Sequence, residues 1–390
     1  MRVAARIKDI AGSSTLEITA RAKQLRQEGL DVVNFGAGEP DFDTPEEIKE
    51  AAINAIRLGF TKYTPSSGIP ELKQAICLKF EKDNNLIYSP SQVVVSCGAK
   101  HSIYNCIQVL LDRGEEVIIP APYWVSYPEM VKLAEAKPII LETLPADNFK
   151  INPKNLERAI TGKTRLLILN SPSNPTGCVY CKEELEKIAD ICVRHKIFVL
   201  SDEIYEKLVY DDAEHISIAS LGKAIYDLTI TVNGTSKAFA MTGWRIGYLA
   251  ADEEIVKAIS KLQDHSTSNP TSISQKAALA ALEAPQEGTL HLQQEFAKRR
   301  DCMLKCLDAA GLSCIRPSGA FYVFCDISST GIGSFEFAKR ILEEEKVALI
   351  PGAAFGNDRF VRLSFCVDCG MIEKGCKRIR EWVKRLPKRS

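Results

Sequence analysis

Short apolar runs rich in β-branched residues recur along the first two thirds of the chain, and longer amphipathic stretches separate them. Because such runs predict buried strands, we expect strands at residues 93–96, 116–119, 138–142, 166–170, 198–201, 229–232 and 246–250. Residues 182–195, between two of these runs, carry apolar side chains at helical spacing. This alternation is typical of an α/β fold in which helices cover both faces of a largely parallel sheet.

The pattern changes near residue 285. A long charged helix is expected there, followed by the strand SGAFYVFCDI, a helix and the strand FVRLSF. We interpret this part as a smaller α+β domain, which a helix at about residues 15–29 joins. The predicted division is an N-terminal segment at 1–47, a large domain at 48–285 and a small domain at 286–390. A ligand is expected in the cleft between domains, at the carboxyl ends of the parallel strands.

Charge and hydropathy exclude some classes of partner. The 390 residues include 50 Lys and Arg against 50 Asp and Glu, so no net field favours nucleic acid or an anionic membrane. No apolar run approaches the roughly 18 residues of a membrane span. The N-terminal sequence MRVAARIKDIAGSS lacks the apolar segment of a signal peptide. We therefore expect a cytoplasmic protein without nucleic-acid or membrane partners.

Thirteen cysteines include two CxxC pairs, Cys178/Cys181 and Cys366/Cys369. A zinc or redox site is one interpretation of such pairs. However, the pairs lie 185 residues apart (366 − 181), and no histidine stands close to either. We expect reduced thiols that act as small buried side chains, and no metal site.

Polar residues follow several predicted strands. Asp202 closes one strand in VLSDEIYEKL, and Tyr205 comes three residues later. Such a carboxylate either caps a helix or is a fixed anion that binds a cation. Asn174 lies in SPSNPTG after another strand, where a turn explains the proline and glycine but not the amide.

Three further positions admit a structural and a functional interpretation. Gly98-Ala99 joins a strand to a helix whose free N–H groups can bind phosphate. Trp124 in APYWVSYPEM either packs in the core or offers a stacking surface. Arg362 lies inside the apolar strand FVRLSF and needs an anion, from a buried ion pair or from a ligand. No P-loop or G-x-G-x-x-G pattern follows a strand, which argues against a dinucleotide-dependent oxidoreductase.

A lysine stands in an unfavourable place in TVNGTSKAFAMTGWRIGY. Lys237 follows an apolar strand and a turn and precedes small and apolar residues, and Arg245 comes eight positions later. Burial among such neighbours lowers the pKa of an amine, which suits imine chemistry.

Taken in this order, these motifs resemble the class I/II aminotransferases of the aspartate aminotransferase family, which are pyridoxal-phosphate enzymes of fold type I. The similarity is closest to the bacterial and plastid-type branch with prephenate-active members. It extends over nearly the whole chain, through AGEPDFDTP, YTPSSGIPELKQAI, PAPYWVSYPEM, SPSNPTG, SDEIYE, SKAFAMTGWRIGY, SGAFYVF and VRLSF. The resemblance implies a mostly parallel seven-stranded sheet in the large domain.

The resemblance also implies roles around the cofactor, pyridoxal 5'-phosphate. Lys237 matches the lysine that holds the cofactor as a Schiff base and later moves a proton as base and acid. Asp202 would hold the ring nitrogen protonated, while Tyr205 and Asn174 would bond the phenolic oxygen. Trp124 would stack on the ring.

Other matches imply a phosphate site and a second subunit. The backbone amides of Ala99 and Lys100, with Arg245, would hold the phosphate, and Ser236 is expected beside it. Tyr63 in TKYTPSSG matches a tyrosine that reaches the phosphate of the neighbouring subunit. The resemblance therefore implies a homodimer with shared active sites.

Substrate contacts follow in the same way. Arg362 would bind the α-carboxylate near the backbone of Gly38, and Trp124 and Asn174 would also touch substrate. Lys100 and Thr15 are expected to face a distal carboxylate, although His101 stands where close relatives often carry glutamine.

We therefore expect ping-pong transfer, through the pyridoxamine form, between aspartate or glutamate and 2-oxoglutarate or oxaloacetate. The alternatives are a prephenate or aromatic amino acid aminotransferase and a pyridoxal-phosphate-dependent β-lyase. A cofactor-binding regulator would need a DNA-binding extension, which the sequence does not suggest.

Overall fold

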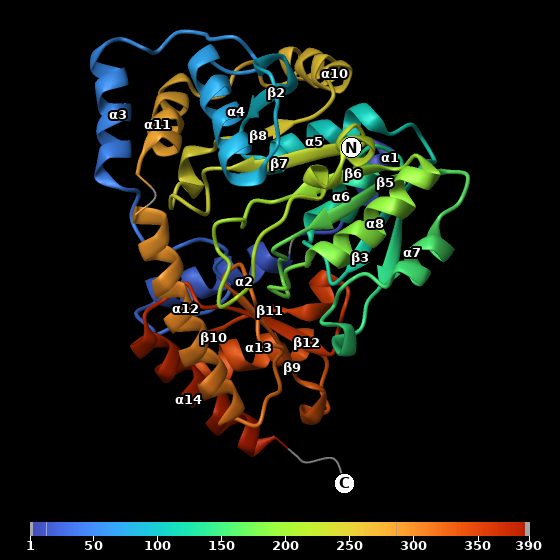
Figure 1. Cartoon of the computed structure of the whole chain (residues 1–390). Coiled ribbons are helices and arrows are strands. Elements are labelled where there is room, and N and C mark those ends of the chain that lie inside the picture. The colour runs from blue at the N-terminus through green and yellow to red at the C-terminus, as the bar shows by residue number, and fades with distance from the viewer. Residues whose placement is uncertain (1–2, 13, 286, 387–390) are drawn as a thin grey trace.

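A seven-stranded sheet forms the centre of the larger part of the molecule (Figure 1). The computed structural model describes residues 3–12, 14–285 and 287–386. The strand order is β2-β8-β7-β6-β5-β3-β4, with bounds β2 (Val93–Ser96), β3 (Glu116–Ala121), β4 (Lys137–Glu142), β5 (Thr164–Asn170), β6 (Phe198–Asp202), β7 (Thr229–Gly234) and β8 (Gly247–Ala250). Only β8 runs antiparallel to its neighbours. All seven predicted strands are confirmed, with bounds that differ by at most two residues.

Helices cover both faces of this sheet. One face packs against α5 (Ala99–Leu110), α6 (Ser126–Leu133) and α10 (Glu253–Asp264). The other face packs against α7 (Pro153–Ala159), α8 (Lys182–His195) and α9 (Lys223–Tyr226), and, beside β2 and β8, against α4 (Pro70–Asn84) and α11 (Ser272–Glu283). Helix α3 (Glu46–Arg57) lies against α11. The sheet is thus buried on both sides, which explains its nearly continuous apolar strands.

Helix α8 shows how the sequence produces these layers. Leu185, Ile188, Ala189 and Cys192 are buried at positions i, i+3, i+4 and i+7, so they form one apolar face toward the sheet. The helix begins at a capping box, in which the Cys181 amide donates to Glu184 Oε2 at 2.8 Å. This cysteine of the first CxxC pair is therefore a helix cap.

The smaller unit lies below the sheet in Figure 1. Its three-stranded antiparallel sheet has the order β11-β12-β9. The unit contains α12 (Glu287–Asp308), β9 (Tyr322–Asp326), α13 (Ser334–Glu345), β10 (Val347–Ala348), β11 (Ile350–Pro351), β12 (Phe360–Ser364) and α14 (Cys369–Arg385). From the N-terminal segment, β1 (Val33–Asn34) pairs with β10 and α2 (Ser14–Gln27) packs beside β11. The division at residues 47 and 285 stays a prediction.

The remaining elements are short: α1 (Ala5–Lys8) and the 3-10 turns η1 (Pro90–Gln92), η2 (Pro145–Asp147), η3 (Ile218–Leu221), η4 (Thr242–Trp244), η5 (Ser328–Thr330) and η6 (Gly352–Phe355). Within the described residues, every helix is too short or too polar to cross a lipid bilayer. All thirteen cysteines are free thiols. In the part of the chain that the structure describes, no cysteine belongs to a cluster of three or more side chains at metal-ligating distances.

Candidate active site

A cavity of about 480 Å³ opens where the parallel strands end. Strands β5, β6 and β7 end at Asn170, Asp202 and Gly234, and their register brings these ends to one edge. Twelve of the thirteen predicted site residues line the cavity: Thr15, Gly38, Ala99, Lys100, Trp124, Asn174, Asp202, Tyr205, Ser236, Lys237, Arg245 and Arg362. A larger hollow of about 740 Å³, between α4 and the junction of α11 with α12, contains none of them.

Lys237 lies in the turn after β7, with its amine directed to the opposite wall of the cavity. Its Nζ donates to the Gly38 carbonyl oxygen at 2.5 Å. The ring centres of Tyr205 and Phe321 lie 5.8 and 5.6 Å from Nζ. Burial lowers the pKa of Lys237 to about 8. A larger neutral fraction of the amine is therefore available near neutral pH than for an ordinary lysine.

Asp202 ends β6 and presents its carboxylate to the cavity. The side chain is buried, the Tyr127 hydroxyl donates to Oδ2 at 2.6 Å, and the Ile204 amide donates to Oδ1 at 3.3 Å. Burial raises the pKa of Asp202 to about 6, although these two donors act in the opposite direction. No α-helix follows, because residues 204–207 form turns, so the helix-cap alternative for Asp202 is wrong.

Arg362 projects from β12 and is 3% exposed. Its Nη1 donates to Asn174 Oδ1 and its Nη2 to the Gly36 carbonyl, each at 3.0 Å. The guanidinium carbon lies 4.3 Å from the ring centre of Tyr322. In the described parts of the chain, no carboxylate lies within ion-pair distance of this guanidinium, and Nε has no hydrogen-bond partner. The structural ion pair considered for Arg362 is therefore wrong, and the cation is left for an anionic ligand.

Backbone and side-chain donors converge at the start of α5. Gly98 has φ +89°, and a Cβ there would lie 2.3 Å from Arg245 Nη2, so only glycine allows this approach. Arg245 donates to the carbonyls of Thr242 at 2.8 Å and Cys97 at 3.4 Å. A guanidinium beside a helix N-terminus forms an anion-binding corner. Ser236 also lines the cavity.

Lys100 and Thr15 form a second group of polar residues that lines the cavity. Lys100 Nζ is 4.8 Å from the ring centre of Trp124, and burial together with the Arg245 charge lowers the pKa of Lys100. Thr15 Oγ1 is buried without a hydrogen-bond partner. His101, in contrast, accepts a hydrogen bond from the Cys97 amide at 3.2 Å and does not line the cavity.

Tyr63 is the one predicted residue that the fold does not bring into the cavity. Its side chain is 91% exposed on the surface of the chain. Within a single subunit, Tyr63 therefore has no role at this site.

The family profile of the class I and II aminotransferases matches residues 30–379. The chain belongs to this family. An aspartate aminotransferase of Bacillus subtilis (strain 168) is 48% identical over 391 residues, which cover 99% of this chain and 100% of the relative. An aspartate/prephenate aminotransferase of Cereibacter sphaeroides is 46% identical, with 96% of each chain covered.

Solved structures give the same result for the fold. The aspartate aminotransferase from Thermus thermophilus with maleate has a TM-score of 0.94 at 44% identity, with 98% of this chain and 100% of that chain covered. The aspartate aminotransferase from Rhizobium meliloti has a TM-score of 0.95 at 40% identity and covers 99% of this chain. The predicted fold type I of the aminotransferases is confirmed.

Three residues of this aminotransferase site were missed in the sequence. Tyr127 donates to Asp202, and Asn170 joins two strand ends: its Nδ2 donates to the Asp202 carbonyl and its Oδ1 accepts from the Asn174 amide, both at 2.8 Å. The hydroxyls of Tyr322 and Tyr205 lie 2.8 Å apart. Tyr127 follows Trp124 by about one helical turn, and Asn170 is the last residue of β5. Their spacing from predicted site residues and strand ends is therefore the sequence feature that could have identified them.

The cofactor-free aminotransferase should gain stability from Asp202→Asn above pH 6. The folded pKa of about 6 exceeds the ordinary value of 3.8. Ionised Asp202 therefore destabilises the fold, and this cost grows as pH rises through that window. We expect D202N to be more stable by on the order of 1–3 kcal/mol at pH 8, and by about half as much at pH 5.

Urea unfolding of cofactor-free protein at both pH values measures this difference. The control is Asp190→Asn, which changes an exposed carboxylate on α8. A D202N difference that stays the same at pH 5 and pH 8 would show that the Asp202 carboxyl has an ordinary pKa.

Proposed function

We propose that this enzyme uses pyridoxal 5'-phosphate to transfer the amino group of aspartate or glutamate to 2-oxoglutarate or oxaloacetate. The observation that carries the proposal is Arg362, a buried guanidinium without a carboxylate partner among the described residues, in one cavity with Lys237 and Asp202. An anion-binding arginine, an amine of lowered pKa and a buried carboxylate are the groups that transamination of an α-amino acid requires.

The residues present fit this cofactor. The helix N-terminus at Ala99, with Arg245 and Ser236, is suited to a phosphate. The carboxylate of Asp202 is suited to a cationic ring nitrogen, because a cation beside a buried carboxyl restores its ionised form. Tyr205 and Asn174 are suited to the phenolic oxygen, and Trp124 to the ring face. When bound, the cofactor supplies an electron sink for the charge that develops at the substrate Cα.

Lys237 would serve first as the covalent attachment and then as the proton carrier. Its amine contacts the carbonyl oxygen of Gly38 at the cavity wall, and the pKa of about 8 leaves neutral amine for both tasks. When it is free, the Lys237 amine would be placed to take the proton from the substrate Cα as a base and to give it back as an acid.

Arg362 would bind the α-carboxylate of either substrate. Asn174 and the Gly36 carbonyl hold the guanidinium in place, and Tyr322 covers its face. This leaves the guanidinium oriented toward the cavity, so that little side-chain entropy is lost on binding.

A second carboxylate would be bound on the other side, by Lys100 and Thr15. The pKa of Lys100 is lowered by burial, and Thr15 Oγ1 is a buried polar atom without a partner. The Thermus relative is described with maleate, a dicarboxylate. Prephenate, which also has two carboxylates, is a second candidate, because relatives at 46% identity are named aspartate/prephenate aminotransferases.

The working enzyme would be a homodimer with shared sites. Tyr63 is an aromatic residue with 91% exposure and no role in its own cavity. In the proposed dimer its hydroxyl reaches the phosphate of the partner subunit.

Lys237→Ala should abolish transamination between aspartate and 2-oxoglutarate, because no other amine takes both of its roles. The protein is expected to fold and to bind the cofactor without a covalent link. Steady-state assays, with melting temperature and cofactor absorbance, provide the measurement. The control is Lys163→Ala, at an exposed position outside the cavity. More than a trace of turnover in K237A, or a loss of stability with turnover intact, would make Lys237 a structural residue.

Lys100→Ala should lower kcat/KM for aspartate and glutamate about ten- to a hundredfold, because a charge-assisted hydrogen bond contributes roughly 1.5–3 kcal/mol. Phenylalanine has no distal carboxylate and should be affected much less. Both donors are measured on the same variant, with cofactor occupancy checked by absorbance. Equal large losses for both donors, together with cofactor release, would instead assign the Lys100 side chain to the phosphate.

Mixing Lys237→Ala with Tyr63→Ala, whose own homodimers are expected to lose activity because each phosphate lacks a donor, tests the shared site. In hybrid dimers of K237A with Tyr63→Ala, one site has Lys237 from one chain and Tyr63 from the other. Random reassembly of an equal mixture should therefore restore about a quarter of wild-type activity, since half of the dimers carry one intact site. If Tyr63 served its own subunit, or if monomers were competent, the mixture would be no more active than its components.

A further inference from the structure

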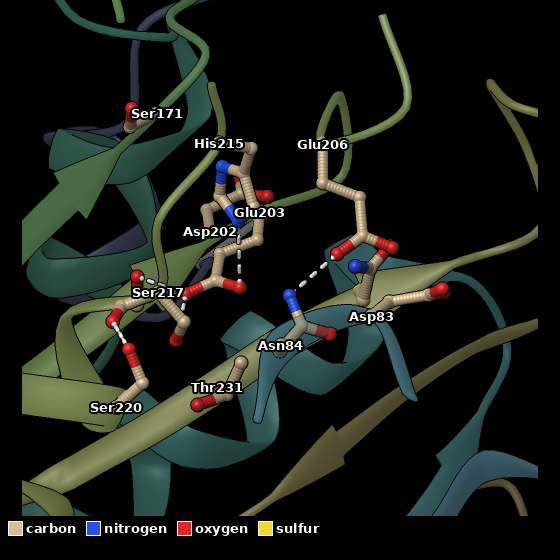
Figure 2. A network of polar contacts seen from close by, with 12 residues as sticks. Asp83, Asn84, Ser171, Asp202, Glu203, Glu206, His215, Ser217, Ser220 and Thr231 are labelled. Atoms are coloured by element: carbon tan, nitrogen blue, oxygen red, sulfur yellow. Dashed lines mark hydrogen bonds and ion pairs between the residues drawn. The ribbon is translucent and has the colours of Figure 1, made fainter. Parts of the chain in front are cut away.

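A buried polar network lies directly behind Asp202, on the side of β6 that faces away from the cavity (Figure 2). Successive side chains of a strand point to opposite faces. Asp202 therefore faces the cavity, while Glu203 faces the network and is 1% exposed. The Glu203 amide donates to the Val232 carbonyl at 2.9 Å, so the ladder between β6 and β7 fixes its backbone.

The Glu203 carboxylate has three donors. The hydroxyls of Ser201 and Ser217 donate to Oε1 at 2.9 and 2.6 Å. His215 Nε2 lies 3.1 Å from Oε2 and must donate, because a carboxylate only accepts. Among the described residues, no lysine or arginine lies within ion-pair distance of Glu203. Its negative charge is thus held by hydrogen bonds rather than cancelled by a lysine or arginine.

Glu206, which lies nearby, differs from Glu203 because a lysine neutralises its charge. It forms an ion pair with Lys79, and its Oε2 accepts from Asn84 Nδ2 at 2.9 Å. Although burial acts in the opposite direction, the Lys79 charge and the hydrogen bonds from Lys79 and Asn84 lower the pKa of Glu206 to about 2. Ligand atoms of Glu203, Glu206 and His215 lie within 4.8 Å of one another, as in metal sites. Yet each carboxylate oxygen already has a donor and Lys79 supplies a cation, so we infer no metal here.

We propose that Glu203 is a positioning residue whose buried carboxylate adds negative potential behind Asp202 and thereby favours the protonated, cationic form of the cofactor. This inference rests on the proposed function. The charge of Glu203 also adds to the effect of burial in raising the pKa of Asp202. Since the effective dielectric constant between buried groups is low, a charge on the adjacent residue acts strongly.

Other ionisable groups surround Asp202 and Glu203, and an experiment that tests the Glu203 charge must leave all of them unchanged. On the network side, the groups in electrostatic contact with Glu203 or its neighbour Glu206 are His215, Lys79, Tyr88 and Tyr248. One step further out, Asp83 forms ion pairs with Lys79 and Lys207. On the cavity side, Tyr127, Tyr205 and Lys237 act on Asp202. Only substitutions at Glu203 remove its charge without changing this set.

The test compares two pairs of proteins, and within each pair the side chains at position 203 have the same shape but differ in charge. Glu203→Gln matches the wild type, and Glu203→Asn matches Glu203→Asp. The E203Q amide can be accommodated, because its oxygen still accepts from the two serines. His215 can move its hydrogen to Nδ1, which has no partner, and then accept from the amide at Nε2. Should E203Q fail to fold, the E203D and E203N pair gives the same comparison.

The readout is the pH midpoint of the absorbance change of the bound cofactor. Loss of a nearby negative charge disfavours the cationic form of the cofactor. The midpoint should therefore lie about one pH unit lower in E203Q than in the wild type, and about one pH unit lower in E203N than in E203D. The rate of the first half-reaction with aspartate should fall about tenfold, while the KM for aspartate stays within about twofold.

Unchanged midpoints in folded E203Q and E203N would overturn the proposal. A shift in E203D as large as that in E203N would also overturn it, because geometry rather than charge would then be responsible. Absence of any cofactor absorbance in the wild type would instead count against the proposed function, which keeps the two failures distinct.

Discussion

The arrangement of this site depends on one constraint: charged side chains are buried close together without neutralising one another. Arg362 contacts an amide oxygen, a carbonyl and two aromatic rings, but no carboxylate of the described chain. Lys237 donates to a carbonyl, and Asp202 accepts from a tyrosine. A stable core would pair such charges or exclude them. The surrounding fold keeps these charges apart, because it fixes each side chain by hydrogen bonds with neutral groups.

Two parts of the fold provide these groups. The edge of the large sheet carries Asp202 at the end of β6 and Lys237 in the turn after β7, and Asn170 links this edge to the turn that holds Asn174. The smaller unit contributes Arg362 from β12. The contact between Arg362 and Asn174 is thus also a contact between the two units. A ligand that contacts Arg362 and the sheet edge would therefore contact both units.

The sequence predicted the strands and most of the site because both depend on local pattern. Apolar runs bounded by turn residues specify the strands, and polar residues at strand ends identify Asp202, Asn174 and Lys237. Contacts between distant segments have no such local signal. Tyr127 reaches Asp202 across 75 positions, and His215 approaches Glu203 only because a loop folds back over β6.

Arg362 and Tyr63 show two further limits of sequence pattern. An arginine in an apolar strand requires an anion, but only the structure shows that the described protein residues do not provide it. Tyr63 is exposed in the single chain, so the role implied by the resemblance depends on a second subunit rather than on this fold. Pattern therefore identifies the chemical groups, while their partners depend on packing and assembly.

Burial acts on the two central groups in opposite directions. It lowers the pKa of Lys237 and raises the pKa of Asp202, so each approaches its neutral form without ligand. A ligand with an anionic phosphate at one end and a basic ring nitrogen at the other would pair with the Arg245 guanidinium and offset the burial of the Asp202 carboxylate at the same time. The cost of burying the charges in the free protein would then be recovered on binding, which favours this ligand over a neutral molecule of the same shape. The same argument applies to Glu203. Its negative charge behind Asp202 has no lysine or arginine of the described chain beside it, so it is favourable only when a cation binds on the cavity side of Asp202.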